Sequence, residues 1–571
     1  MTRLSLTERL RITGLGLDRA RRATVSRVLA SPAVRWSFGP QSADQLLIVP
    51  QDLRTADPSF WRELKLGQLG LAGSTADLGG RSPFDVRPPS DGWARALYGF
   101  GWLRHLDAVE NPEAREMARS LAIDWASHRR ATRTSRFDAA VRGRRMISWL
   151  SHANLLLEGA DQRSFDVIAD SLGAQTNNLA ATWRDVPPGH PRLLALVALT
   201  LADLCIAGHD IRLAGVERAL SLELDHQILP DGGHIGRNPL TPIELLLDLL
   251  PLRQCFASRG RPVPPSLAGA IARMLPLVRM MRLGDGQTAR FNGMGVASPA
   301  AQATVLAYED TSKPLPRSAP ESGYARLERG QTVIVADVGA APPLEYAGAA
   351  CAGCLSFELS VGTSPVFVNG GAPSASDDAW RPASRATACH NTASLAEQSS
   401  SRLVRHAGLE RLVGATPIRG PDVVSFALTE LPQADGALML EGHHNGYIGR
   451  FGLMHSRKLT LSADGRRLDG VDYLDGPGRM PVRLAEDVPL AVHFHLHPGV
   501  VCRHGDNPRT VLLSLDDGAE LRFTSATLPI AVEESIHFAD SSGPAASLQL
   551  VLRDLTRGGS EIGWTLERVD A

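Results

Sequence analysis

Cysteine and lysine are scarce in this chain of 571 residues. Six cysteines are too few for a disulfide framework in a protein of this size. Cys351 and Cys354 form a C-x-x-C pair on an expected strand, where residues three apart point to opposite faces, which excludes a shared metal or a redox pair. With only three lysines, nearly all the positive charge is arginine. A GC-rich genome explains this bias most simply, and arginine forks that bind carboxylate or sulfate at two points are the alternative.

The sequence also lacks a long hydrophobic run and an excess of either charge. No apolar run reaches the ~18 to 20 residues of a membrane helix, so we expect no membrane span. The formal net charge is −1, which gives no general attraction for nucleic acid, and we expect no nucleic-acid partner. Residues 1–31 are arginine-rich and amphipathic, without the apolar core and cleavage site of a signal peptide. We therefore expect a cytoplasmic chain, and the oligomeric state stays open.

A chain of this length is too long for a single hydrophobic core. Two different hydrophobicity patterns meet near residue 320. From about residue 97 to 281, apolar residues recur at helical spacing, as in residues 137–157. Residues 193–206 are apolar on all sides, which is typical of a fully buried helix. Proline- and glycine-rich breakers separate these segments. Buried inner helices paired with amphipathic outer helices predict an α/α toroid, an incomplete barrel, over residues 1–315.

A linker rich in proline and serine, residues 311–322, leads into short runs that alternate between apolar and polar residues. These runs are residues 324–330, 331–337, 356–362, 366–368, 458–462, 491–497 and 511–515. They predict an antiparallel β-sandwich over residues 322–571. His493, His495 and His497 share one face of such a strand, but they span ~13 Å, too far to ligate one metal together. We interpret them as a polar sheet face.

Two polar segments of the helical half are candidates for a binding site. Arg145 and Trp149 lie one helical turn apart, so they share a face that can bind a sugar; a solvated basic face is the alternative. His190 follows Pro187-Pro188-Gly189 and precedes the buried helix. The positive end of a helix dipole favours a neutral imidazole, which can act as a base. A helix-entry histidine bonded to the backbone is the alternative.

A third candidate is the glycine-rich segment that begins Pro230-Asp231-Gly232-Gly233 and carries His234, Arg237 and Asn238. A structural turn requires glycine and aspartate, but not these three side chains together. In the sandwich half, two polar clusters contain His390 and the pair His444 and Tyr447. Each cluster can line a groove or form a sandwich turn.

In their order and spacing, these segments resemble the heparinase II/III superfamily of polysaccharide lyases. Pro230-Asp231-Gly232-Gly233 resembles the family's P-D-G-G, and His390-Asn391-Thr392 resembles the H-N-T that opens a strand of its C-terminal domain. His190 falls where the family has N-H at a helix mouth, and Arg145 to Trp149 matches its R-x-x-x-W. The resemblance implies an α/α toroid packed against an antiparallel β-sandwich, with a substrate groove between them.

The resemblance also implies β-elimination on a uronate-containing acidic polysaccharide or oligosaccharide. Such a site neutralises the C5 carboxylate, removes the C5 proton and protonates the leaving O4. It implies catalytic roles for His190, His234 and His390. It further implies substrate contacts from Arg145, Trp149, Arg237, Asn238, His444 and Tyr447. A lyase of this kind belongs in the periplasm or cell envelope, which conflicts with the cytoplasmic expectation and keeps both open.

The chain departs from the family pattern at several positions. Gly189 replaces the usual Asn, Gly236 the acidic residue, Thr241 the Tyr that serves as base and acid, and Pro242 the following His. Thr241 cannot replace a phenol, because an alkyl hydroxyl is far less acidic. At the family's zinc positions this chain has Ala349, Cys351, Gly353 and Asn369, with only His444 retained. We therefore predict no zinc, and the sequence indicates no other cofactor.

Three hypotheses follow. In the first, His190 or His234 replaces the tyrosine of a polysaccharide lyase. In the second, the chain is a non-catalytic carbohydrate-binding relative that retains the groove. In the third, it is a glycoside hydrolase, which requires two opposed carboxylates; Asp231 and Glu244 are the nearest pair.

Overall fold

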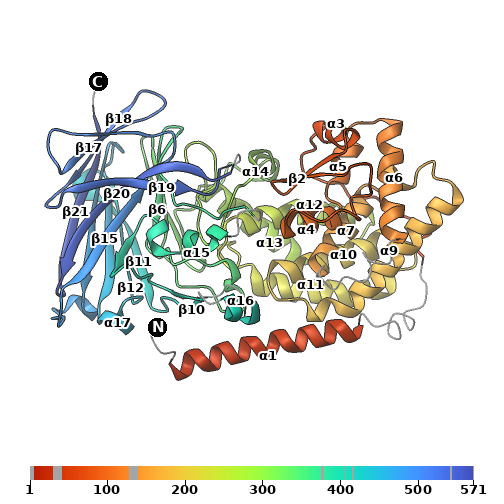
Figure 1. Cartoon of the computed structure of the whole chain (residues 1–571), viewed down its shortest axis with the longest axis horizontal. Coiled ribbons are helices and arrows are strands. Elements are labelled where there is room, and N and C mark those ends of the chain that lie inside the picture. The colour runs from red at the N-terminus through yellow and green to blue at the C-terminus, as the bar shows by residue number, and fades with distance from the viewer. Residues whose placement is uncertain are drawn as a thin grey trace.

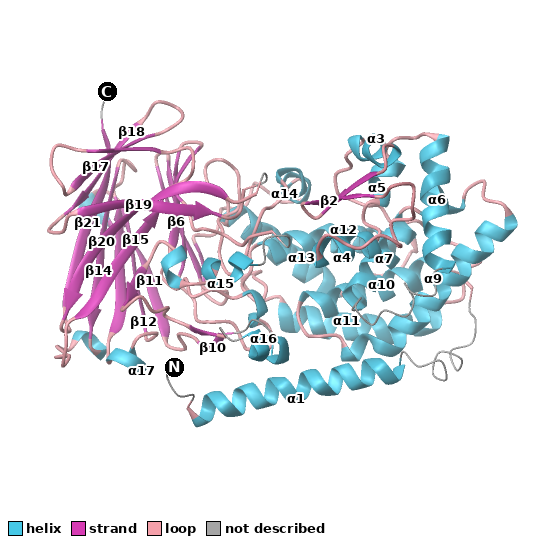
Figure 2. Cartoon of the chain, in the orientation of Figure 1, coloured by secondary structure: helices cyan, strands magenta, loops and turns pink. Residues whose placement is uncertain are grey.

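The computed structural model describes residues 5–29, 42–127, 139–374, 379–404, 407–413, 417–540 and 543–569. Helices form the N-terminal half and antiparallel sheets the C-terminal half, and the halves lie side by side along the long axis (Figures 1 and 2). Residues 137–138 of one expected helix, and residues 1–4 and 30–31 of the N-terminal segment, lie outside the described residues. This architecture confirms the expected order of a helical toroid and an antiparallel sandwich.

The helical half is built around two helices that are buried on nearly all sides, α10 and α12. The helices of this half are α1 (Leu6–Leu29), α3 (Ser59–Lys65), α4 (Asp91–Gly99), α5 (Leu103–Asp107), α6 (Pro112–Ser127), α7 (Ala139–Ser151), α8 (Ala153–Leu157), α9 (Gln162–Thr182), α10 (His190–Cys205), α11 (Leu213–Gln227), α12 (Leu240–Ser258), α13 (Pro265–Met280) and α14 (Pro299–Leu306). Short 3-10 turns, η1 (Trp183–Asp185) and η2 (Asp210–Arg212), join some of them.

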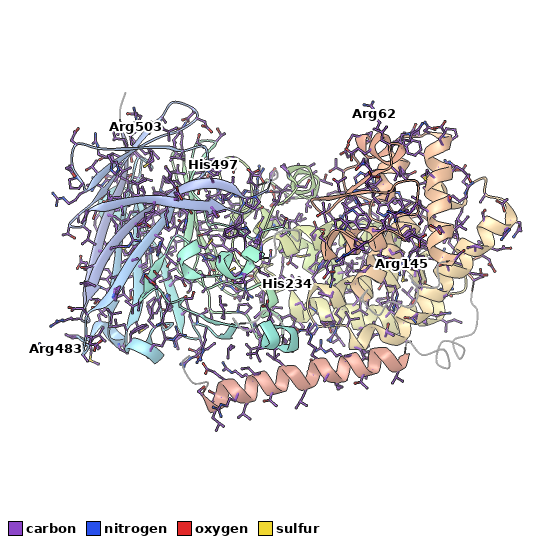
Figure 3. All side chains as sticks on the ribbon, viewed as in Figure 1. Arg62, Arg145, His234, Arg483, His497 and Arg503 are labelled. Atoms are coloured by element: carbon purple, nitrogen blue, oxygen red, sulfur yellow. The ribbon has the colours of Figure 1, made fainter. Side chains whose placement is uncertain are left out.

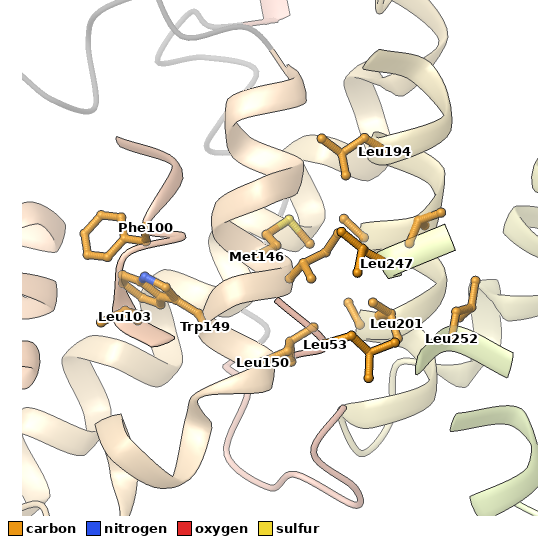
Figure 4. Close-up of a cluster of buried hydrophobic side chains, with 14 of the residues drawn as sticks. Leu53, Phe100, Leu103, Met146, Trp149, Leu150, Leu194, Leu201, Leu247 and Leu252 are labelled. Atoms are coloured by element: carbon orange, nitrogen blue, oxygen red, sulfur yellow. The ribbon is translucent and has the colours of Figure 1, made fainter. Parts of the chain in front are cut away.

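The expected all-apolar helix is α10, which packs against α7, α11 and α12. Its side chains Leu194 and Leu201 meet Met146 of α7 and Leu247 of α12 in the core (Figure 4). Full burial of each such side chain contributes about 1.5–3 kcal/mol. The expected helix over residues 137–157 is interrupted at His152, where α7 ends and α8 begins.

The sheet half contains an eight-stranded, a five-stranded and a four-stranded antiparallel sheet. Their strands are β3 (Ser318–Ala319), β4 (Tyr324–Arg329), β5 (Thr332–Asp337), β6 (Phe357–Val361), β7 (Ser364–Phe367), β8 (Ala393–Leu395), β11 (Val424–Leu431), β12 (Ala437–His444), β13 (Met454–Leu461), β14 (Arg467–Asp475), β15 (Val488–His495), β16 (Val501–His504), β17 (Thr510–Ser514), β18 (Glu520–Ser525), β19 (Ile530–His537), β20 (Ala545–Thr556) and β21 (Ser560–Val569). The remaining strands form two small pairs, β1 (Gln68–Leu71) with β2 (Ser74–Asp77) and β9 (Arg402–Leu403) with β10 (Pro417–Arg419). Short helical segments connect the strands: η3 (Ala347–Ala349), α15 (Arg381–Ser384), η5 (Thr387–Cys389), α16 (Ala407–Val413), η6 (Pro432–Ala434), α17 (Ile448–Phe451) and η7 (Pro477–Arg479).

The sheets enclose one apolar core in which aromatic rings meet. Phe494 lies 4.8 Å from Trp564 between ring centroids, and Phe357 stacks on Trp564 at 5.9 Å. The strand order β11-β12-β13-β14-β21-β18-β17-β16 forms the large sheet, and β3 to β7 form the sheet that faces the helical half. The β1–β2 hairpin within the helical half has no counterpart in the sequence prediction.

One local expectation needs correction. The strand expected around Cys354 begins only at Phe357, because the chain turns at Leu355 with φ +62°. The argument that a strand separates Cys351 from Cys354 therefore does not apply. The expected polar sheet face is present and buried: His493 bonds to Ser394 and Gln549, and His495 bonds to Ser535.

The N-terminal helix α1 runs along the outside of both halves (Figure 1). Glu8 pairs with Arg402 of the sheet half at 2.9 Å, and Arg21 lies 3.7 Å from Asp185 of the helical half. Within the described ranges, no helix is both long enough and apolar enough to cross a membrane.

Candidate functional site

The loop between α11 and α12, which begins at Pro230, joins the two halves of the molecule. Its Asp231 carboxylate accepts hydrogen bonds from the Ser322 backbone N–H at 2.7 Å and from the Ser322 hydroxyl at 3.0 Å. A side chain on Gly233 would collide with Ser322, so glycine is required for this close approach. The P-D-G-G segment therefore lies at the interface between toroid and sandwich.

Arg237 is the central residue of this interface. Its guanidinium donates to the carbonyl oxygens of residues 322, 323, 339 and 340 and pairs with Asp337. These bonds use all five N–H donors of the side chain, and the group lies over the Tyr324 ring at 5.2 Å. Asp337 also accepts from Asn292 at 3.1 Å. A guanidinium held in this way has no donor left for a substrate carboxylate, so the structure gives Arg237 a structural position.

His234 lies in the same loop, between the helical and sheet halves (Figure 3). The Gly236 N–H donates to its Nδ1 at 3.0 Å, so the ring proton sits on Nε2 and is donated to Gln227 at 3.1 Å. Burial, followed by the nearby His190, lowers the pKa of His234 to about 3. The ring is neutral, and both nitrogens are engaged. Asn238 is engaged as well, because its side chain accepts from the Leu240 N–H at the start of α12.

His190 is the first residue of α10, as expected. Its Nε2 is buried and has no hydrogen-bond partner within the described chain. Burial and the positive charge of Arg144 lower the pKa of this imidazole, against the opposing effect of Asp248. His190 therefore carries a neutral ring with one uncommitted nitrogen.

A loop of the sandwich, residues 339–350, covers this region with Tyr346, which the sequence analysis did not consider. The Tyr346 ring lies 5.9 Å from that of His226 and 6.4 Å from that of His234. A Cβ on Gly189 would lie 3.5 Å from Tyr346 Cδ1, and one on Gly236 would lie 3.1 Å from the Tyr346 carbonyl oxygen. The two positions at which the family has Asn and an acidic residue are thus glycines packed against Tyr346. Burial, followed by Glu345 and Glu223, raises the pKa of Tyr346 to about 12.

The predicted residues of the sandwich are buried in its interior. His390 donates from Nδ1 to the Ala386 carbonyl at 2.8 Å and is 3% exposed. Burial lowers its pKa. Tyr447 is fully buried and donates to the Ala393 carbonyl at 2.9 Å. These contacts hold strands and turns together and leave neither side chain facing a groove.

His444 begins a buried chain of hydrogen bonds. The Gly446 N–H donates to its Nδ1, so its Nε2–H donates to Nδ1 of His455 at 3.2 Å. His455 donates in turn to Asp472 at 2.7 Å, and Arg457 donates to both oxygens of that carboxylate. Within the described ranges, no group of three His, Cys, Asp or Glu side chains is arranged to hold a metal.

Arg145 and Trp149 lie in the core of the helical half (Figures 3 and 4). The Arg145 guanidinium lies 4.0 Å from the Trp125 ring centroid and donates to Gln175 and to the Tyr98 carbonyl, both at 2.6 Å. Trp149 is 1% exposed and packs edge-on against Phe100. The shared helix face expected to bind sugar is therefore packed inside the protein, because its neighbours are apolar and aromatic.

A cavity of about 470 Å³ opens within the helical half, among residues that no motif brings together. It is lined by Asp52, Arg54, Thr55, Gly70, Leu71, Ala72, Arg95, Ala96, Gly99, Gly101, Trp102, Arg104, His105, Arg144, Ile147, Ser148, Glu244, Leu247, Ser298 and Ala301. Two of its arginines converge on the buried Asp248: Arg54 at 2.8 Å and Arg144 through two contacts of 2.7 Å. Burial alone would raise the pKa of Asp248, but these guanidiniums hold it well below its usual range.

Arg104 differs from the other arginines of the cavity. It donates from Nε to the Thr55 carbonyl at 3.0 Å and from Nη1 to the Gly101 carbonyl, and no described carboxylate pairs with it. Its Nη2 makes no hydrogen bond within the described residues. Burial, together with the nearby Arg54, lowers its pKa despite Asp52. This guanidinium is an uncompensated positive charge in the cavity wall.

His105 follows Arg104 and also lines the cavity. The Asp57 N–H donates to its Nδ1 at 2.7 Å, so Nε2 carries the proton of the neutral ring. Burial and then Arg104 lower the pKa of His105 to about 4. Its ring packs against Phe60 at 5.0 Å between centroids. The cavity thus places a cation beside a neutral N–H donor.

The fold, a helical toroid followed by an antiparallel sandwich, is that of heparinase II/III-like proteins. Residues 311–565 match the family described as Heparinase II/III-like, C-terminal. The solved structure of a heparan sulfate lyase HepC mutant from Pedobacter heparinus aligns with TM-score 0.61 and 15% identity, over 97% of this chain and 89% of that one. Heparinase III aligns with TM-score 0.69 and 12% identity, over 87% and 81%. Residues 311–565 therefore carry the C-terminal domain of the heparinase II/III-like family, and the whole chain has the fold of these two lyase structures.

A relative along nearly the whole chain is FtsZ-localized protein C of Caulobacter vibrioides (strain NA1000 / CB15N). The two are 31% identical over 540 residues, which cover 91% of this chain and 90% of the relative. The lyase structures share far less sequence, so their likeness establishes the fold alone.

Proposed function

We propose that this chain binds an acidic saccharide in the arginine-lined cavity of its toroid and does not cleave it by β-elimination. One observation carries the proposal: the Arg104 guanidinium lines the cavity and has no carboxylate partner among the described residues. The nearby carboxylates Asp52, Glu244 and Asp248 are already in contact with other arginines. A guanidinium fork matches a carboxylate or sulfate. The volume of about 470 Å³ lies in the range of small-ligand sites.

The charges of the cavity support a binding role. Arg54 and Arg144 share Asp248, and Arg54 also contacts Glu244 at 3.2 Å. Asp52 accepts from the Arg54 N–H and lies 3.4 Å from His152. Carboxylates held in this way serve poorly as the acid and base of a glycoside hydrolase, which needs one carboxyl with a raised pKa.

The rival hypothesis is a lyase in which histidine replaces tyrosine. A general base needs a lone pair within reach of the substrate proton. The lone pair of His234 accepts the Gly236 N–H, and His390 is buried in the sandwich. His190 retains a free nitrogen, but Tyr346 and its loop pack over the helix mouth, and none of these histidines lines the cavity. Loss of a general acid–base lowers rates by ~10²- to 10⁴-fold.

Calorimetric titration with uronate oligosaccharides, paired with an absorbance assay for unsaturated uronate, tests the proposal. We expect binding without absorbance growth, and at least ~10-fold weaker binding in Arg104→Gln. Arg62→Gln is the matched control, because Arg62 is exposed on α3 and does not line the cavity. Absorbance growth that disappears in His190→Ala would instead establish the lyase. Absence of binding to any acidic saccharide would reject the proposal.

The relative from Caulobacter favours a second role. We infer that this chain, like the protein whose name says that it localises with FtsZ, associates with FtsZ. Identity of 31% across 91% of the chain supports this inference, because it includes both halves. Co-sedimentation of the purified chain with FtsZ polymers from the same organism tests it. We expect the chain in the polymer pellet, and its absence there at micromolar concentrations would contradict the inference.

A further inference from the structure

A second cavity, of about 260 Å³, lies between the start of α1 and the strands β9 and β10 (Figure 1). Glu8 of α1 lines one side of it, and Arg402 of β9, Arg419 of β10 and Arg450 of α17 line the rest. Of the described residues that line it, none also lines the toroid cavity. It is therefore a separate site from the one proposed for a saccharide.

Two arginines of this cavity lie directly opposite each other. Arg402 and Arg419 are paired across the short antiparallel ladder of β9 and β10. Side chains paired in this way share one face of the strands, with Cβ atoms about 4.5–5.5 Å apart. Like charges in such a position repel each other and destabilise the ladder. An anion that contacts both guanidiniums would relieve this repulsion.

The two guanidiniums differ in the partners that they have. Arg402 donates from Nη1 to both carboxylate oxygens of Glu8, at 2.9 and 3.1 Å. Arg419 is exposed and makes no hydrogen bond or ion pair with any residue that the structure describes. A Cβ on Gly449 would lie 3.1 Å from its Nη1, so the guanidinium lies close to the backbone there. The other carboxylate of the cavity, Asp422, is bound by the Asn445 side chain.

The charge of the two arginines favours phosphate over a carboxylate. One carboxylate, that of Glu8, binds Arg402 and leaves Arg419 without an anion. A phosphate monoester carries about −1.5 to −2 charges at pH 7 and has three acceptor oxygens. A guanidinium binds such a group through two parallel N–H···O bonds. Phosphate can therefore contact both arginines, and in doing so it competes with Glu8 for Arg402.

Displacement of Glu8 has a consequence for α1. Glu8 is only 5% exposed, and a buried carboxylate that loses its cation is strongly destabilised. The first turn of α1 would therefore move so that Glu8 reaches water. One turn further along, Ile12 and Leu15 pack against a small apolar cluster that includes Ile418. These apolar contacts do not depend on Arg402, so they hold the remainder of the helix in place.

We propose that the cavity between Glu8, Arg402 and Arg419 binds a small soluble phosphate monoester, which displaces Glu8 from Arg402 and releases the first turn of α1. The two events are linked. Phosphate weakens the docking of this turn by the same factor by which the docked turn weakens phosphate binding. The inference does not depend on the saccharide proposed for the toroid cavity.

Calorimetric titration of the full chain with glycerol phosphate tests the site. We expect binding by the wild type and at least ~10-fold weaker binding by Arg419→Gln, whose fold should be unaffected because Arg419 bonds to no described residue. Glu8→Gln is expected to bind ~5- to 10-fold more tightly, since the competing carboxylate is removed. Arg503→Gln is the matched control: Arg503 pairs with Glu520 on the surface of the sandwich, and its loss should leave the affinity unchanged (Figure 3).

Hydrogen exchange of the full chain, read by mass spectrometry, tests the release of α1. We expect saturating glycerol phosphate to speed exchange in the first two turns of α1 in the wild type, and to have no such effect in Arg419→Gln. Absence of binding at millimolar concentrations, or equal affinity of the wild type and Arg419→Gln, would overturn the site. Binding to anionic phospholipid vesicles but not to the soluble ester would overturn it as well. Binding with unchanged exchange, together with unchanged affinity in Glu8→Gln, would overturn the link to α1.

Discussion

Replacing Arg237 by methionine removes the central contact between toroid and sandwich while keeping a side chain of similar length. In the native protein, this guanidinium donates to four backbone carbonyls of residues 322–340 and pairs with Asp337. The variant leaves Asp337 buried without its cation, with only Asn292 and a backbone N–H as donors.

The magnitude follows from these contacts. Breaking a buried ion pair by removing one partner costs about 3–5 kcal/mol, because the remaining charge is left desolvated. Each carbonyl that loses its donor and is not reached by water adds about 1–3 kcal/mol. Both Arg237 and Asp337 are nearly inaccessible, with exposures of 6% and 3%, so little solvent screening reduces the effect. We expect a loss of at least about 4 kcal/mol in the free energy of unfolding.

Chemical denaturation measures this loss, followed by far-ultraviolet circular dichroism, to which the toroid helices contribute most, and by tryptophan fluorescence, to which both halves contribute. A further consequence is that the halves uncouple, so the two signals change at different denaturant concentrations. Arg467→Met is the control: Arg467 pairs with Asp469 on the surface, with side-chain exposures of 49% and 44%, and its loss is expected to cost under about 1 kcal/mol. Equal stability of the Arg237 and Arg467 variants would refute the reasoning.

Three further predictions concern other buried groups. Asp248→Asn is expected to lower the free energy of unfolding by about 3 kcal/mol at pH 7, measured by thermal denaturation. Because the native pKa of Asp248 is depressed, the carboxylate stabilises the fold above about pH 4. The difference between wild type and variant should therefore close as the pH falls below that value. Burial raises the pKa of Glu358 to about 7, so its contribution to stability is lost as the pH rises from about 4.5 to 7. The stability of Glu358→Gln relative to wild type should therefore increase by about 3 kcal/mol between pH 5 and pH 8. A difference that stays constant with pH would contradict this. Gly189→Asn restores the residue usual in the family, but Gly189 has φ +97° and ψ −162° and packs against Tyr346. We therefore expect denaturant titration to show a loss of about 1–3 kcal/mol in the free energy of unfolding. An unchanged stability would count against the packing argument.

Much of the fold could be predicted from local patterns. The all-apolar run that became α10 and the alternating runs that became β13 and β17 follow from periodicity, since burial on all sides or on one side leaves a direct trace in the sequence. The start of β6 could not be placed this way, because Leu355 adopts a left-handed backbone conformation. A leucine in the sequence gives no reason to expect this conformation.

The site was harder to predict for a physical reason. Arg237 stands in a polar, glycine-rich segment that fits a binding loop, but its partners lie about a hundred positions further along the chain, and only the folded structure shows that they use every donor. The cavity draws Arg54, Arg104 and Arg144 from separate elements without motif spacing. The signal present in the sequence was Trp102 close before Arg104 and His105, an aromatic beside a cation and an imidazole.

The most direct test of the account is the affinity of an unsulfated uronate tetrasaccharide for the wild-type chain and for Arg104→Gln, measured by calorimetry on folded proteins. We predict binding by the wild type, a loss of at least ~10-fold in the variant, and no unsaturated uronate formed by either. Equal affinity of the two proteins, or formation of unsaturated product by the wild type, would contradict a non-cleaving site built around Arg104.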